Sequence, residues 1–161
     1  MEALSAQLGR APTQQEVRES VLMMREQKGS LIMEGRLSYK SVGSFFHMPF
    51  VSAEEYERLI ARAREMDAEK EARLRPWAWK QADGSYKIAP GFLLEYTKFQ
   101  KGYVQGGTGI SPRHTLSIIN VDGARAHDIA MLAHDMQEKV RSIFGITLER
   151  EVEYVGEVEK N

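Results

Sequence analysis

HTLSIINVDGARAHDIAMLAHDMQEKVRSIFGITLEREVEYV, residues 114–155, contains the clearest fold signal in the chain. Residues 114–121 have the pattern of a strand, and an Asp-Gly turn closes it. A helix is predicted over 125–144, because apolar residues recur there at helical spacing and Gly145 follows as a stop signal. Residues 146–155 predict a final strand. The predicted core face of the helix consists of Ile129, Leu132, Met136, Val140 and Ile143.

Two more helices are predicted upstream, each from a capping box followed by apolar residues at helical spacing. Thr13 and Glu16 form the first box and begin a helix over about residues 13–28. Ser52 and Glu55 form the second box and begin a charged surface helix that reaches about residue 72.

The remaining segments predict extended or turned backbone and one short helix. Residues 41–51 are expected to be extended or turned, and residues 74–87 to form a long loop or a loose hairpin. A short helix is expected over 90–99 and a strand over 103–110. Helices and strands mixed without a strict strand–helix–strand rhythm predict an α+β fold. We expect a single two-layer domain with helices packed on a largely antiparallel sheet.

Charge and composition exclude several classes of protein. The 161 residues include 22 Lys and Arg against 23 Asp and Glu, a formal charge of −1, and no cysteine. Disulfide scaffolds and Cys-based zinc sites are therefore excluded, and the balanced charge gives no reason to expect a nucleic-acid partner. The longest apolar run, Ile129–Ala133, is far shorter than the roughly 20 residues of a membrane span. The N-terminal residues also lack the pattern of a secretory signal, so no membrane partner is expected.

Three patterns that suggest chemistry have simpler explanations. The glycines at 102, 106, 107 and 109 lack the Lys-Ser or Lys-Thr of a phosphate loop, so hairpin glycines explain them better. His127 and His134 are seven residues apart, about 10.5 Å along a helix, which is too far for both to bind one metal ion. No serine-hydrolase elbow surrounds Ser44, so the residues next to it, taken by themselves, indicate a serine in a turn.

Three segments together resemble a known enzyme family. They are SVGSFFHMPFVSAEE at 41–55, QADGSYKIAPGFLLE at 81–95 and FGITLEREVEYVG at 144–156. In order and spacing they are similar to the C-terminal substrate-binding domain of the UDP-N-acetylenolpyruvoylglucosamine reductases, the MurB family. The likeness covers nearly the whole chain. It implies a cytoplasmic oxidoreductase that uses NADPH and FAD to convert UDP-N-acetylglucosamine enolpyruvate to UDP-N-acetylmuramate, for peptidoglycan synthesis and cell wall biogenesis.

The resemblance implies roles for three residues in particular. The serine of the family's GSFF motif, its general acid, corresponds to Ser44, and its catalytic glutamate corresponds to Glu151. Without the resemblance, the acids alternating at 149, 151 and 153 indicate a solvated strand face. The family lysine that binds the substrate diphosphate corresponds to Lys28, which otherwise reads as a lysine at a helix C-terminus.

Four further substrate-binding positions follow from the resemblance, and three of them depart from the family pattern. A polar contact before a central strand corresponds to His114. His47 and Met48 stand where the family usually has Lys-Asn, which changes the expected contacts to the nucleotide. Trp79 is nearest to a tyrosine that closes over the substrate in one branch of the family, and tryptophan cannot donate the same phenolic hydrogen bond.

The family's flavin-binding domain precedes the part that this chain resembles. We therefore expect FAD to be bound mainly by that N-terminal domain, with no cofactor-binding residue in this chain, and residues 1–12 to be an interdomain segment. Two alternatives have no redox activity: a stand-alone UDP-sugar-binding or regulatory module, and an inert interaction domain that keeps only the fold. The presence of both Ser44 and Glu151 favours the enzyme, because a mere binding module has no use for a proton donor.

Overall fold

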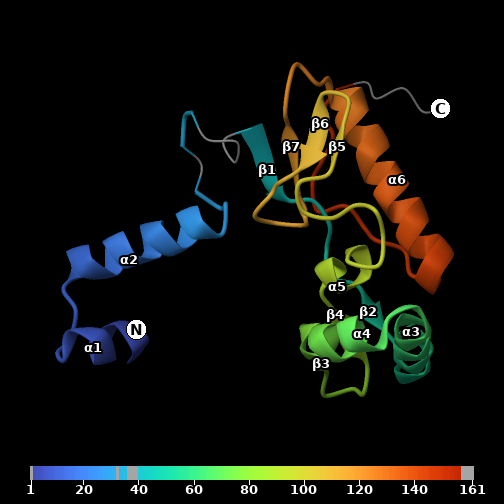
Figure 1. Ribbon diagram of the computed structural model, residues 1–161, viewed down its shortest axis with the longest axis horizontal. Coiled ribbons are helices and arrows are strands. Elements are labelled where there is room, and N and C mark those ends of the chain that lie inside the picture. The colour runs from blue at the N-terminus through green and yellow to red at the C-terminus, as the bar shows by residue number, and fades with distance from the viewer. Residues whose placement is uncertain (1, 32, 36–39, 157–161) are drawn as a thin grey trace.

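The helix predicted over 125–144 is α6, Ala126–Phe144, and it packs on a four-stranded antiparallel sheet (Figure 1). The computed structural model describes residues 2–31, 33–35 and 40–156. The predicted core face is confirmed at Leu132, Met136 and Val140, which are fully buried, while Ile129 and Ile143 are half-buried. The sheet has the order β1-β7-β6-β5, made of β1 Ser41–Ser44, β7 Ser117–Asn120, β6 Thr108–Ile110 and β5 Val104–Gln105.

A second, three-stranded antiparallel sheet lies below the first in Figure 1 and has the order β2-β4-β3. Its strands are β2 Phe50–Val51, β3 Ala78–Lys80 and β4 Tyr86–Ile88. Helix α3, Ala53–Met66, contacts both β2 and α6, and its Tyr56 ring stacks on Tyr86 with 3.8 Å between centroids. The α+β prediction is confirmed, with two antiparallel sheets in place of one. Of the two readings of 74–87, the hairpin is correct.

The segment predicted as one helix from Ser52 to about residue 72 is two helices, so that prediction was wrong at Asp67. After α3, the backbone at Asp67 is extended with φ −166°, and α4, Ala68–Leu74, begins. The Asp67 carboxylate accepts a hydrogen bond from the Lys70 N–H at 2.8 Å. A side chain that caps the next helix competes with continuation of the helix before it. A short 3₁₀ turn, η2 Arg75–Trp77, follows α4.

Two predicted elements in the second half of the chain, one helix and one strand, have the expected type of secondary structure but different bounds. The helix predicted over 90–99 is α5, Pro90–Leu94, and it ends early because the Thr97 hydroxyl donates to the Leu94 carbonyl and accepts from the Phe99 N–H. The strand predicted over 103–110 is a hairpin of β5 and β6. Its turn lies at Gly106 and Gly107, so the reading of these residues as hairpin glycines is confirmed.

The strand predicted over 146–155 is wrong, because only one β-bridge, Phe46 to Arg150, forms within this described segment. The N–H of His47 donates to the Glu149 carbonyl at 2.9 Å, and the N–H of Glu151 donates to the Phe45 carbonyl at 3.0 Å. Pairing cannot continue, because the Phe45 N–H already donates to Leu116 and Pro49 has no N–H. The segment is nevertheless tied down by the buried Leu148 side chain.

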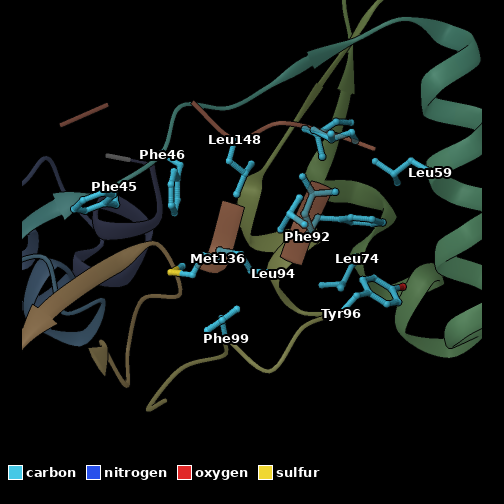
Figure 2. Close-up of a cluster of buried hydrophobic side chains, with 14 of the residues drawn as sticks. Phe45, Phe46, Leu59, Leu74, Phe92, Leu94, Tyr96, Phe99, Met136 and Leu148 are labelled. Atoms are coloured by element: carbon cyan, nitrogen blue, oxygen red, sulfur yellow. The ribbon is translucent and has the colours of Figure 1, made fainter. Parts of the chain in front are cut away.

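One hydrophobic core joins the two sheets and helices α3 to α6 (Figure 2). Its fully buried members come from β-strand ends, α3, α5, α6 and the 146–148 segment, and they include Phe45, Phe46, Leu59, Phe92, Leu94, Met136 and Leu148. Phe45 and Phe46 directly follow Ser44. The core therefore fixes the backbone on which Ser44 is carried.

The N-terminal helices α1, Glu2–Leu8, and α2, Gln14–Gln27, lie to one side of both sheets (Figure 1). The capping box at Thr13 forms as predicted, and no residue of α2 is buried. Whether residues 1–12 connect two domains stays a prediction. In the part of the chain that the structure describes, no helix is long and apolar enough to cross a membrane.

Candidate functional site

A cleft of about 270 Å³ lies between the end of α2, strand β1 and the loop before β7. Ser44 and His114, both singled out from the sequence, line this cleft. The lining combines one arginine with four serine hydroxyls, and its described residues include no carboxylate. Such a surface suits an anionic ligand that is rich in oxygen atoms. The lining residues are Arg25, Gly29, Ser30, Ser41, Val42, Gly43, Ser44, His114 and Ser117.

Ser44 stands at the end of β1, where the pairing with β7 is irregular. Ser41 pairs with Ile119 and Ser44 pairs with Ser117, so β1 has one residue more than β7 between these pairs. Gly43 takes up this bulge with φ +91°. Ser44 is exposed, yet the bulge before it and the buried aromatic pair after it fix its place in the cleft.

Glu151 lies on the segment that runs antiparallel to residues 45–47, just after β1 ends. Its backbone N–H binds the carbonyl of Phe45, the residue after Ser44. Its carboxylate Oε2 lies 4.0 Å from the His47 Nδ1, with both side chains about half exposed. The fold therefore brings the 44–47 and 149–151 segments together, although Glu151 does not line the cleft itself.

The end of α2 forms the opposite wall of the cleft. Lys28, the C-cap residue of α2, does not line the cleft itself, whereas the next two residues, Gly29 and Ser30, do. Arg25, one turn before Lys28, also lines the cleft and was missed in the sequence analysis. Its spacing of three residues from Lys28, which places both side chains on one face of a helix, was the available signal.

His114 is half-buried between the cleft and a second cavity of about 180 Å³ that Trp77, Lys101 and Arg113 also line. Burial, and secondarily the charge of Lys101, lower the pKa of His114 below its ordinary value. Its Nδ1 accepts a hydrogen bond from the Leu116 N–H at 3.3 Å. The imidazole is therefore neutral at pH 7 and carries its hydrogen on Nε2, which can donate to a ligand.

Met48 and Trp79 have less direct relations to the cleft. Met48 is half-buried next to His47 and does not line the cleft. Trp79 lies on β3 of the other sheet, opposite Lys87, and is 46% exposed. It is Trp77, rather than Trp79, that lies beside His114. The substrate contacts expected at Met48 and Trp79 stay predictions.

The comparison with known proteins decides the family. The family model of the UDP-N-acetylenolpyruvoylglucosamine reductase C-terminal domain matches residues 35–155. The chain belongs to this family. Proteins named UDP-N-acetylenolpyruvoylglucosamine reductase from Thermobifida fusca (strain YX) and Mycobacterium tuberculosis (strain ATCC 25618 / H37Rv) are each 36% identical to it. The matches cover 88% and 96% of this chain, and 39% and 41% of the relatives. The chain thus spans about two fifths of the length of these reductases.

In this family member, the glycines at 102, 106, 107 and 109 do not form a phosphate loop. Its densest run of glycines is the β5–β6 hairpin, and the position of a Cβ on Gly107 is only 2.3 Å from the Asp122 carbonyl oxygen. That space is filled by backbone and is not open to a diphosphate. Among the described residues, no group of three or more His, Asp or Glu is placed to hold a metal ion.

Proposed function

We propose that this chain is the substrate-binding part of a UDP-N-acetylmuramate dehydrogenase, which reduces UDP-N-acetylglucosamine enolpyruvate in the cytoplasm as a step of peptidoglycan synthesis. Family membership supports the reaction. The observation that carries the proposal is the placement of Ser44 in a cleft whose other wall is formed by Arg25, Gly29 and Ser30 at the end of α2, directly beside Lys28. A proton donor and a site for anionic phosphate oxygens then face one ligand.

The reaction adds one hydride and one proton across the enolpyruvyl double bond and yields a lactyl ether. FAD, held by another part of the reductase and reduced by NADPH, supplies the hydride. Hydride addition to one carbon of the double bond leaves the neighbouring carbon as part of an enolate of the carboxylate. Ser44 protonates this carbon from its hydroxyl. A serine hydroxyl is a weak acid, but an enolate carbon is a strong base, so a fixed donor suffices.

In this proposal, Glu151 and His47 support the proton transfer from the paired 45–47 and 149–151 segments next to Ser44. A hydrogen bond from the Glu151 side of the site to the enolate oxygen would stabilise the charge that develops there. The Glu151 carboxylate Oε2 lies 4.0 Å from the Nδ1 of His47. Glu151 would otherwise orient a water or Ser44.

Lys28, Arg25 and His114 bind the diphosphate in this proposal. Lys28 supplies a compact charge, Arg25 a planar fork, and the neutral His114 a donor at Nε2. The cleft of about 270 Å³ is smaller than most ligand pockets, which hold about 300–1,000 Å³. It accommodates only part of a nucleotide sugar, so we propose that the flavin-binding part of the reductase completes the site.

Lys28→Ala tests the proposal in a full-length reductase that contains this chain. The KM for the UDP-sugar should rise about 10- to 100-fold, because a charge-assisted hydrogen bond to phosphate is lost. Reduction of the flavin by NADPH should be unchanged. Arg18→Ala is the matched control, since Arg18 is an exposed cation on the same helix about 15 Å from Lys28. Equal KM values for the two variants at low salt would refute diphosphate binding by Lys28.

A further inference from the structure

Arg113 reaches from the loop before β7 to the end of α2. Its Nη1 donates to the Glu26 carbonyl oxygen at 2.5 Å. At this end of α2, the Gly29 N–H binds the Glu26 carbonyl at 3.0 Å and the Ser30 N–H binds the Arg25 carbonyl at 2.8 Å. The carbonyl end of a helix carries partial negative charge, which a guanidinium stabilises. Arg113 therefore acts as a second cap, supplied from another part of the fold.

This contact matters because α2 packs little of its surface on the described part of the fold. None of the residues of α2 is buried. The turn after it fits closely against Arg113, because a Cβ on Gly29 would lie 2.9 Å from the Arg113 Cβ. Gly29 also has φ +68°, a conformation that favours glycine. The loop end of the contact is fixed as well, since the Arg113 N–H donates to the Ser111 hydroxyl at 3.3 Å.

The two ends of this contact carry different parts of the candidate site. The α2 end carries Arg25 and Lys28, and the loop carries His114 next to Arg113. We propose that Arg113 is a positioning residue, which ties the end of α2 to the 111–116 loop and so holds Lys28 beside the cleft that contains Ser44. The role in substrate binding rests on the proposed function, whereas the tie itself is a property of this chain alone.

Steady-state kinetics of the full-length reductase test whether Arg113 acts through Lys28. Arg113→Ala should raise the KM for the UDP-sugar on the order of tenfold, with kcat within about twofold. Arg113→Lys should recover part of the loss, because an ammonium can still donate to the Glu26 carbonyl. In a Lys28→Ala background, Arg113→Ala should raise KM no further. An unchanged KM for Arg113→Ala, or an equal rise in both backgrounds, would overturn the proposal.

Hydrogen exchange on the 161-residue chain tests the tie without any assumption about function. Arg113→Ala should speed exchange of the Gly29 and Ser30 amides by about tenfold or more, as the end of α2 opens more often. The Gly145 amide at the end of α6, which binds the Arg141 carbonyl, is the internal control and should not change. Unchanged exchange at Gly29 and Ser30 would overturn the tie. Absence of UDP-sugar turnover in the parental reductase would instead refute the proposed function.

Discussion

Gly43→Ala separates the geometry of Ser44 from its chemistry. Gly43 has φ +91°, and no heavy atom of the described residues lies within 4 Å of the position that a Cβ would take. Alanine therefore meets no neighbour, and the cost of the substitution is backbone strain alone. A left-handed conformation costs an L residue about 1–2 kcal/mol. At roughly 2–4 °C per kcal/mol for a chain of this size, Tm should fall by about 2–8 °C.

The same strain acts directly on the bulge that presents Ser44. If the backbone relaxes toward negative φ, the pairing of Ser44 with Ser117 shifts and the hydroxyl moves with it. A displacement of about 1 Å at a reacting group can cost about 10²-fold in rate. We therefore expect reoxidation of the reduced flavin by the UDP-sugar to slow about 10²-fold in the full-length reductase.

Gly84→Ala is the matched control. Gly84 has φ +85° and lies in the turn between β3 and β4 of the other sheet. In the described part of the chain, no heavy atom lies within 4 Å of its Cβ position either. Thermal unfolding should show similar losses of Tm for the two variants. Stopped-flow absorbance should show slow reoxidation only for Gly43→Ala. If both variants reoxidise at the same rate, the bulge does not position Ser44 and the reasoning is wrong.

Three further substitutions test the fold around the site. Burial lowers the pKa of His114, so as pH falls below about 6.5 the unfolded chain binds a proton more readily than the folded chain, and the free energy of unfolding decreases. His114→Gln should remove the His114 contribution to this decrease, measured by urea unfolding between about pH 7.5 and about pH 5.5. Leu148→Ala should cost about 2–5 kcal/mol in the same assay, against less than about 0.5 kcal/mol for the exposed neighbour Thr147→Ala. Hydrogen bonds from Arg75 lower the pKa of the buried Glu71 in the folded chain. The resulting stabilisation is present above the pKa that Glu71 has in the unfolded chain, and it is lost as pH falls through its pKa in the folded chain. The parental chain should therefore lose its higher free energy of unfolding relative to Glu71→Gln as pH is lowered below about 4.5.

The helices could be predicted from the sequence because their signals are local. The capping boxes at Thr13 and Ser52 both form, and Gly145 ends α6 with φ +70°. Each signal depends on residues within one turn of a helix. The break at Asp67 was missed, since aspartate fits both a helix surface and a cap, and only the structure shows which one it adopts.

The sheet and the cleft depend on contacts that no local pattern contains. Residues 146–155 have the alternation of a strand, but in their partner segment the Phe45 N–H is already engaged and Pro49 has no N–H to offer a ladder. Ser44 and His114 are 70 residues apart and meet only through the pairing of β1 with β7. Their placement in one site followed from the family resemblance, and Arg25 and Arg113 emerged only from the structure.

The most direct test of the account is the rate at which a Ser44→Ala reductase, with its flavin already reduced, is reoxidised by UDP-N-acetylglucosamine enolpyruvate. Reduction of the flavin by NADPH should stay near the parental rate, because that step needs no proton on the substrate carbon. Reoxidation, followed by stopped-flow absorbance, should slow by about 10²–10⁴-fold as for a lost general acid, and Ser44→Cys should recover part of it. Reoxidation of the Ser44→Ala enzyme at the parental rate would contradict the account and make Ser44 a turn residue, with Glu151 the remaining candidate for the proton donor.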